Sequence, residues 1–387
     1  MRYLRTLSTR SLLVLVAAVA LLAGGGAAIA VAAAGGKGPT PPPKALPQAL
    51  YDALAGPEPD GITARIKFTN NLFPSGALLG QAGSALLSGA SGRLWLTNDG
   101  RGRLELQSDA GDAQVVWNRS EVTVYDASSN TVYRAQLPAH KQESGSGSAP
   151  SVTEIADFLT KVGQYADVSG ARPTDVAGRP AYSVSISPKH DGGLLGSAEL
   201  AWDAERGVPL RIGIYAQGSS SPVLQLEATH ISYGAVPDSD VNVAPPAGAK
   251  TVDVGAPPAG HENGKAKPVT GLDAVQAAAG FHVVAPDTLV GLPRQDVRLA
   301  GKAVLVVYGH GLGAIVVVER AADSAAAGRS GGMLSSLPTV SLDGATGHEL
   351  ATQLGTVLGW QRSGVDFVLA GSLPPAAAET AARDLSK

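Results

Sequence analysis

The sequence predicts an α+β protein dominated by antiparallel β-structure, with a smaller C-terminal α+β domain. Between Ile62 and Tyr233, short apolar–polar alternations are separated by turns rich in Gly, Asn and Ser. In the first alternation, Ala64, Ile66 and Phe68 follow Ile62 at every second position, with polar residues between them. This period of two places the apolar groups on one face of a sheet. That face must be covered by another part of the protein or by a ligand.

The composition narrows the class of protein. A length of 387 residues suits about two domains. The net charge is only -3, so the protein has no strong positive electrostatic potential that would attract nucleic acid. The 48 glycines and 26 prolines, with only 16% charged residues, favour a loop-rich β protein. There is no cysteine, so a lipid-anchored lipoprotein is excluded and folding depends on core burial without disulfides.

The N-terminus, residues 1–36, is predicted to be a signal peptide or an N-terminal membrane anchor. Arg2, Arg5 and Arg10 precede an apolar run from Leu12 to Val31. Small-residue cleavage candidates in its second half favour a signal peptide. The full run, however, is about 20 residues or about 30 Å as a helix, enough to span a bilayer. Both alternatives place the rest of the chain outside the cytoplasm.

The remaining chain divides by its proline- and glycine-rich stretches. We predict a Pro-rich spacer at 37–47, a first β domain at 48–243, a linker at 244–268 and a C-terminal domain at 269–387. Ser151 and Glu154 form a capping box that opens the most regular helix. The predicted helices are 46–54, 151–165, 272–279 and 375–385. The predicted strands after the first are 93–97, 102–108, 113–118, 121–125, 131–136, 181–187, 197–202, 208–215, 223–233, 281–285, 303–309, 314–319, 339–342, 356–362 and 365–370.

The stretch 72–90 contains no charge and includes Leu72, Phe73, Leu78 and Leu79. Its first interpretation is a hairpin tip or covering loop over the sheet. The alternative is a lid or membrane-contact loop, for which these four residues are the candidates.

Several loose motifs resemble the lipoprotein-carrier-like superfamily, which includes LolA, RseB and actinobacterial relatives. The motifs are aromatic and turn positions: Trp202-Asp203, Gly207-Val208-Pro209-Leu210-Arg211, Tyr215, Ile231-Ser232-Tyr233-Gly234, Ala177-Gly178-Arg179-Pro180-Ala181-Tyr182, Val124-Tyr125-Asp126 and Asn130-Thr131-Val132-Tyr133. Residues after Leu272, with Trp360 among them, resemble the C-terminal domain of sporulation-associated carrier-like proteins. The resemblance implies a curved open antiparallel sheet, a half-barrel, with helices on its concave side. It also implies binding of lipid or acyl chains there, or sensing through an anti-sigma partner.

No set of residues supports an enzyme. Gly328-Arg329-Ser330-Gly331-Gly332 matches the nucleophile-elbow pattern by letters, but it falls in a Gly/Ser/Ala loop instead of a strand-to-helix turn. The seven histidines are scattered without metal-ligand spacing, and no phosphate-cradling loop is present. We therefore predict no catalytic residue, no metal and no cofactor.

The expected function is an extracytoplasmic, non-enzymatic carrier or binding protein that holds a lipid or lipoprotein acyl chain. The alternative is an envelope-stress sensor that binds an anti-sigma factor or another envelope protein. An apolar ligand needs no charged contact, because burial contributes about 25 cal/mol per Å² of apolar surface. The candidate lining residues are Ile66, Phe68, Leu104, Leu106, Trp117, Ile186, Trp202 and Ile214.

Overall fold

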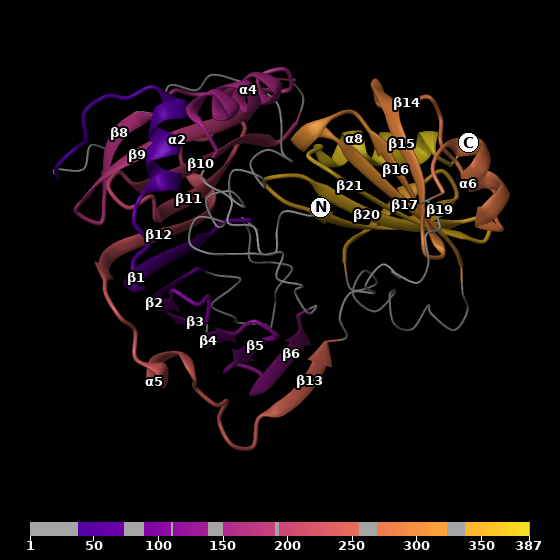
Figure 1. Cartoon of the computed structure of the whole chain (residues 1–387). Helices are drawn as coiled ribbons and strands as arrows, with labels where there is room; N and C mark the ends of the chain where they lie inside the picture. The colour runs from indigo at the N-terminus through magenta and orange to yellow at the C-terminus, as the bar shows by residue number, and fades with distance from the viewer. Residues whose placement is uncertain are drawn as a thin grey trace.

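The protein contains two separate β-sheets with helices packed on them (Figure 1). The computed structural model describes residues 38–386, apart from 73–88, 110, 138–149, 190–192, 255–268 and 323–336. The predicted α+β class is confirmed. The predicted N-terminal signal or anchor segment lies outside the described residues. Within the described ranges, no helix combines the length and apolar character that crossing a bilayer requires.

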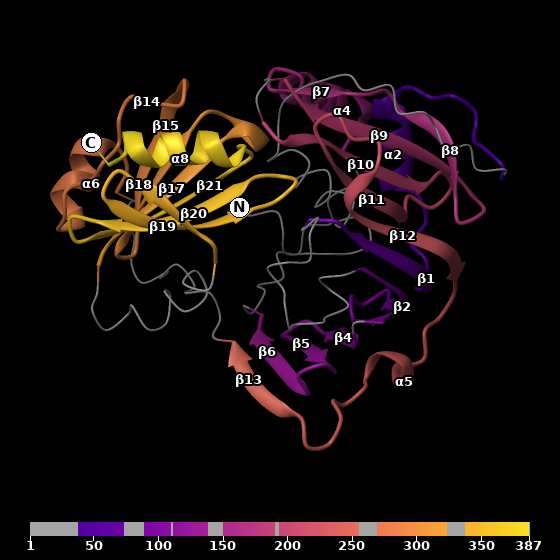
Figure 2. The same cartoon turned by 180° about the vertical axis from the view of Figure 1, so that it is seen from behind.

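The first sheet has 13 strands in the order β13-β6-β5-β4-β3-β2-β1-β12-β11-β10-β9-β7, with β8 beside β9. All its pairings are antiparallel except that of β13 with β6. Figures 1 and 2 show these strands following an arc, so the sheet is open and curved. The bounds are β1 Gly61–Asn70, β2 Ala90–Thr97, β3 Gly102–Ser108, β4 Gly111–Trp117, β5 Glu121–Asp126, β6 Thr131–Gln136, β7 Ala166–Val168, β8 Arg172–Val176, β9 Arg179–Pro188, β10 Leu195–Asp203, β11 Pro209–Ala216, β12 Pro222–Tyr233 and β13 Lys250–Val254.

Strand β1 holds the two halves of this sheet together. It pairs with β2 on one side and with β12 on the other. The register of β1 with β12 runs from Ile62 opposite Tyr233 to Asn70 opposite Leu224, with a β-bulge between Arg65 and Ile66. A bulge increases the local twist of a strand pair. The irregularity therefore lies at the centre of the curved sheet.

Two helices cover one end of the sheet. Helix α4 (Val152–Val162) begins at the predicted capping box, in which the Ser151 hydroxyl accepts from the Glu154 backbone N–H. Helix α2 (Leu46–Ala55) has a proline in its first turn, where no backbone donor is lost. Its C-terminal turn lies against Gly207, which has φ +67° and would place a Cβ 2.1 Å from the Ala53 carbonyl oxygen. Only glycine fits this approach without strain.

The β10–β11 turn is organised by the fully buried Asp203. Its Oδ2 accepts from Arg179 Nε at 2.9 Å and from the Tyr233 hydroxyl at 2.7 Å. Its Oδ1 accepts from the backbone N–H groups of Glu205 and Arg206. Burial and the bond to Asp203 raise the pKa of Tyr233 above its ordinary value. One carboxylate thus connects β9, the β10–β11 turn and the end of β12.

The second sheet has 8 strands in the order β14-β15-β16-β17-β21-β20-β19-β18, all antiparallel. Its apolar core includes Val275 of helix α6, together with Ala378, Ala381 and Ala382 of helix α8. Alanines on α8 let its backbone approach the strands closely. The bounds are α5 Asp238–Val241, α6 Leu272–Ala279, β14 Thr288–Leu289, β15 Leu292–Ala300, β16 Ala303–Tyr308, β17 Ile315–Ala321, β18 Thr339–Leu342, β19 Ala345–Ala351, β20 Thr356–Arg362, β21 Val365–Gly371 and α8 Pro375–Asp384, with a 3-10 turn at Gly311–Gly313.

Two sequence expectations differ from the structure. Residues 250–254, predicted as part of the linker, form β13, because their partner β6 lies far away in sequence. The predicted strand at 281–285 is irregular. There the Val283 and Val284 N–H groups are bonded by the side chains of Gln276 and Glu319 instead of by a neighbouring strand. Strands β7, β8, β14, β15 and β19 were not predicted, since their apolar alternation is weak.

Glu319 is fully buried in the second sheet. Its Oε2 accepts from the Val284 N–H at 2.9 Å, and its Oε1 has no hydrogen-bond partner among the described residues. Burial raises the pKa of Glu319 from 4.5 to about 7. The folded state therefore holds a proton at pH values where the unfolded chain has lost it.

We predict that the free energy of unfolding falls as the pH rises from 4.5 to about 7, because ionised Glu319 is disfavoured in the folded core. A shift of this size corresponds to about 3 kcal/mol. Glu319→Gln keeps the acceptor for Val284 and should remove most of this pH dependence. Urea denaturation across this range measures it, with the exposed Asp167→Asn as control. An unchanged pH dependence in Glu319→Gln would contradict the assignment.

A second prediction compares the two carboxylates that contact Arg179. Asp203→Asn turns an amide N–H₂ toward the donors of Arg179 and Tyr233, so we expect a loss of about 2 kcal/mol in unfolding free energy. The side chain of Glu205 is 68% exposed, and Glu205→Gln should change stability by less than about 0.5 kcal/mol. Equal losses of unfolding free energy for the two substitutions, measured by chemical denaturation, would show that burial of Asp203 does not contribute to stability.

Candidate apolar binding face

The strand register places a continuous row of apolar residues of the first sheet on one face, here called the inner face. Directly opposite residues of antiparallel neighbours lie on the same side of a sheet. One such row crosses six strands from β1 to β6. It consists of Ala64, Leu94, Leu104, Val115, Val124 and Tyr133.

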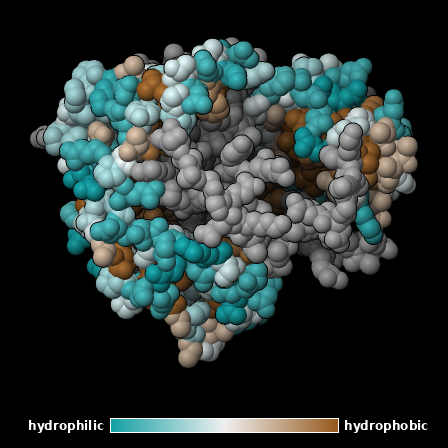
Figure 3. All heavy atoms as spheres, viewed as in Figure 1, coloured by the Kyte–Doolittle hydropathy of each residue, from teal (hydrophilic) through white to brown (hydrophobic). Residues whose placement is uncertain are grey.

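The opposite side, here called the outer face, is polar. Thr63, Arg65 and Lys67 of β1 lie there, and the described surface around β2 to β6 is largely hydrophilic in Figure 3. Helix α5 contacts β2 and β3, and its Asp238 forms an ion pair with Arg101 at 2.9 Å. Alternation with period two therefore places these charged side chains on the outer face, which also includes the buried Trp95 and Val132.

Helices α2 and α4 cover only one half of the inner face. The apolar cluster that contains α2 draws its strand residues from β7, β9, β10 and β11, with Trp202 fully buried beneath Leu46 and Ala49. A second cluster, on β1 to β4 and β12, is built around Ile66 and Leu106. Among the described residues, this second cluster has no helical member. This helix-free half of the inner face is therefore the candidate region for an apolar ligand.

Several apolar side chains on this helix-free half keep solvent contact. Phe68, Leu94, Leu104 and Val115 are partly buried, and Tyr133 is 40% exposed. The five inter-strand steps from β1 to β6, at about 4.8 Å each, give a row about 24 Å long along the sheet. One leaflet of a bilayer core is about 15 Å thick, so the row is long enough for an acyl chain.

The predicted lining residues all fall on the inner face, in two groups. Ile66, Phe68, Leu104, Leu106 and Trp117 lie on β1, β3 and β4 of the helix-free half. Ile186, Trp202 and Ile214 lie on the same face of β9, β10 and β11. Contact of these residues with a ligand stays a prediction.

Within the second group, two side chains are part of the helix-covered core. Trp202 has no exposed surface, and Ile186 packs with Ala166 and Val162 near α4. Both positions fill space between the sheet and the helices. Ile66 and Leu106 of the first group are equally buried. The partly buried Phe68, Leu104, Trp117 and Ile214 are therefore the better candidates for contact with a guest.

The candidate lid residues are described only at Leu72. The Leu72 carbonyl accepts from the Gln353 N–H at 3.3 Å, and Gln353 Nε2 donates to the Asn71 carbonyl at 2.7 Å. These bonds connect the end of β1 to the loop after β19 of the second sheet. Phe73, Leu78 and Leu79 lie outside the described residues, so their role as a lid or membrane-contact loop stays a prediction.

The predicted lining residues did not include Leu94, Val115 and Val124 of the inner-face row. Each belongs to a predicted strand, but the face of a strand relative to its neighbours depends on register. The signal was present in the alternation itself. Aligning the predicted strands as a meander, turn by turn, would have placed these side chains in one row with Leu104.

Trp117 lies across a glycine of the neighbouring strand. A Cβ on Gly102, its direct partner, would be 2.2 Å from Cζ2 of the indole. The absence of a side chain at this position lets the ring lie against β3. The glycine thus shapes the inner face next to Leu104.

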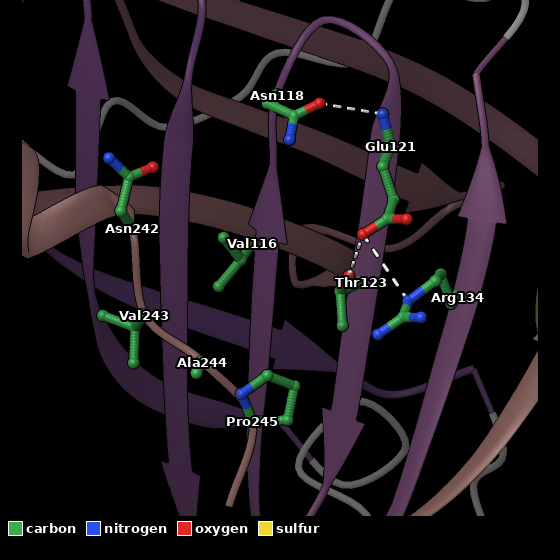
Figure 4. A pocket seen from close by; sticks show the side chains of 9 residues that line it. All are labelled: Val116, Asn118, Glu121, Thr123, Arg134, Asn242, Val243, Ala244 and Pro245. Atoms are coloured by element: carbon green, nitrogen blue, oxygen red, sulfur yellow. Dashed lines mark hydrogen bonds and ion pairs between the residues drawn. The ribbon is translucent and has the colours of Figure 1, made fainter.

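The outer face carries a polar pocket of about 260 Å³ between β4, β5, β6 and residues 242–245 (Figure 4). Glu121 and Arg134 face each other across it at 3.6 Å, and the Asn118 side-chain oxygen accepts from the Glu121 N–H at 2.9 Å. These charges compensate each other. In the described ranges, no group of three or more His, Asp or Glu residues is arranged to hold a metal ion.

Comparison with known proteins gave similarity to solved structures alone. No protein-family model matches the chain, and no curated protein matches it. The MucA/MucB complex of Pseudomonas aeruginosa aligns with 15% identity and a TM-score of 0.42, over 87% of this chain and 94% of that chain. A structure of MucB aligns with 15% identity and a TM-score of 0.37, over 88% and 96% of the two chains. An outer membrane lipoprotein-sorting protein domain of Vibrio parahaemolyticus aligns with 8% identity and a TM-score of 0.18, over 51% and 96%.

These alignments give similarity to MucB and to a lipoprotein-sorting domain, and they do not assign the chain to a family. Identities of 8–15% and TM-scores below 0.5 give no information on what this chain binds. The actinobacterial type and the sporulation-associated C-terminal domain stay predictions.

We predict that Gly102→Ala moves Trp117 away from β3, because the new Cβ and the indole cannot occupy the same space. Forcing an extra methyl group into a packed site costs about 1–3 kcal/mol. Tryptophan fluorescence should shift to longer wavelength, and the midpoint of urea unfolding should fall. Gly170→Ala is the control, since a Cβ there meets nothing within 4 Å. Identical spectra for wild type and Gly102→Ala would contradict this placement of Trp117.

Proposed function

We propose that the protein is an extracytoplasmic carrier or binding protein that holds an acyl chain of a lipid or lipoprotein against the helix-free half of the inner face. One observation carries the proposal: a row of apolar side chains crosses β1 to β6 in register, and several of its members are only partly buried. The basic residues before the apolar N-terminal run support a location outside the cytoplasm.

Binding at this face needs no chemistry beyond burial of apolar surface. Each methylene group removed from water contributes about 0.8 kcal/mol. A chain laid across the strands contacts Leu94, Leu104, Val115 and Val124 in turn, because they are directly opposite one another. The charged head of the guest then remains at the edge of the sheet, in water. Such a site selects for a long apolar chain and tolerates different headgroups.

The proposal is tested with neighbouring substitutions on one strand. Val115 lies on the inner face and Gln114 on the outer face of β4. Val115→Glu places a charge where the acyl chain binds and should weaken binding at least about tenfold, whereas Gln114→Glu adds the same charge on the other side and should leave binding unchanged. Displacement of a fluorescent fatty acid from the purified full chain measures the affinity.

Leu104→Trp provides a second, uncharged variant that fills the face without introducing a buried charge. It should also reduce affinity, while circular dichroism verifies folding of every variant. Equal affinities of wild type, Val115→Glu and Leu104→Trp would exclude an acyl site on this face. Absence of fatty-acid binding by the folded wild type would also refute the proposed function.

The alternative is a sensor that binds an anti-sigma factor or another envelope protein. The observation in its favour is the exposure of Phe158, at 46%, on helix α4, near the 51% exposed Tyr165. Large exposed aromatic side chains are typical of protein contact sites. Crosslinking in envelope extract that is lost in Phe158→Asp, with fatty-acid binding intact, would favour this alternative.

A further inference from the structure

The outer face of the first sheet carries a second pocket, of about 450 Å³, on the side opposite to the apolar row. It extends over β1, β2, β3 and the bulge of β12. Its lining residues are Arg65, Ile66, Lys67, Ser91, Gly92, Arg93, Glu105, Gln107 and Thr229. Three cations and one carboxylate give this lining a net charge of +2.

In the part of the chain that the structure describes, the cations of this pocket form no ion pair with a carboxylate. Among the described residues, no ion pair involves Arg65, Lys67 or Arg93. The one carboxylate of the lining, Glu105, is bonded to Arg103 instead. Glu227 lies opposite Lys67 on β12, but it contacts Arg211 at 3.5 Å. Within the described ranges, the three cations of the pocket thus form no ion pair.

The register concentrates this charge. Arg65 is directly opposite Arg93 of β2 on one side and His230 of β12 on the other. Like charges directly opposite each other destabilise a strand pair. An anion between the two arginines would convert this repulsion into attraction. The same register places Glu105 opposite Arg93 and Glu227 opposite Lys67, so the repulsion is concentrated between Arg65 and Arg93.

The local backbone provides the hollow. The register between β1 and β12 shifts between Arg65 and Ile66, which leaves Thr229 as the extra residue of a bulge. A bulge bends the strand and redirects its side chains. On the β2 side, a Cβ at Gly92 would lie 1.8 Å from the Glu105 carbonyl oxygen, so the two backbones meet closely there. The pocket lies between these two irregularities.

We propose that this outer-face pocket binds a phosphate group. Two guanidinium groups and an ammonium group match the several oxygens of a phosphate, and arginine binds phosphate with paired parallel hydrogen bonds. The hydroxyl group of Ser91 and the amide of Gln107 add neutral donors, whereas the Thr229 hydroxyl donates to the Arg65 carbonyl at 3.3 Å. A single carboxylate would occupy only one arginine. The phosphate belongs either to a free phosphate or diphosphate, or to the phosphomonoester headgroup of a lipid.

The experiment measures binding to the purified full chain in low salt. Inorganic pyrophosphate in isothermal titration calorimetry tests the free anion. Co-sedimentation with phosphatidylcholine vesicles, with and without phosphatidic acid, tests the headgroup. Arg65→Gln combined with Arg93→Gln should weaken binding at least about tenfold, and added salt should weaken wild-type binding. Arg172→Gln is the control, because Arg172 is an exposed arginine of the same sheet with no ion pair among the described residues.

Each outcome decides the proposal. Binding of pyrophosphate or of phosphatidic acid vesicles that is lost in the double variant and kept in Arg172→Gln supports it, and the probe that binds identifies the source. No binding of either probe, or equal loss in the control, overturns it. Fatty-acid binding to the inner face is measured in parallel. Because the two sites lie on opposite faces, the double variant should leave it unchanged, so failure of one site is distinguishable from failure of the other.

Discussion

The pairing of β1 with β12 is the constraint on which the rest of the first sheet depends. Thr63 lies opposite Ser232, 169 residues later in the chain, and this ladder joins the meander β1 to β6 to the strands β9 to β12. Without it, the apolar residues of the two halves would belong to separate small sheets. With it, they share one face. The cost of bringing such distant segments together is offset by an extended ladder of backbone hydrogen bonds and by burial of Ile62, Ala64 and Ile66.

A buried carboxylate secures one end of that ladder. Asp203 accepts a hydrogen bond from the hydroxyl of Tyr233, the last residue of β12. It also forms an ion pair with Arg179 at the start of β9. The same turn contains Gly207, against which the end of α2 packs. This turn and the apolar cluster of Leu46, Ala49 and Ala53 with Trp202 together hold α2 over one half of the inner face.

The two proposed sites lie on opposite faces of one sheet. On β1, Ile66 faces the apolar side while Arg65 and Lys67 face the charged side. A change of register by one residue would exchange them, which is why the register is strongly determined. The proposed acyl site and the proposed phosphate site are thus separated by the thickness of a single sheet, and neither requires the other to be occupied.

Features that depend on neighbours within a few residues could be predicted from the sequence alone. They include the strand alternation, the Ser151 capping box and the helix at 272–279. They also include the apolar positions Ile66, Phe68, Leu104 and Leu106. Only the tertiary structure decided the rest. Residues 250–254 form a strand because they pair in parallel with β6, a partner far away in the sequence. Trp202 belongs to the core because α2 covers it. The row through Leu94, Val115 and Val124, and the cations around Arg65, depend on cross-strand register, a non-local property that no single segment encodes.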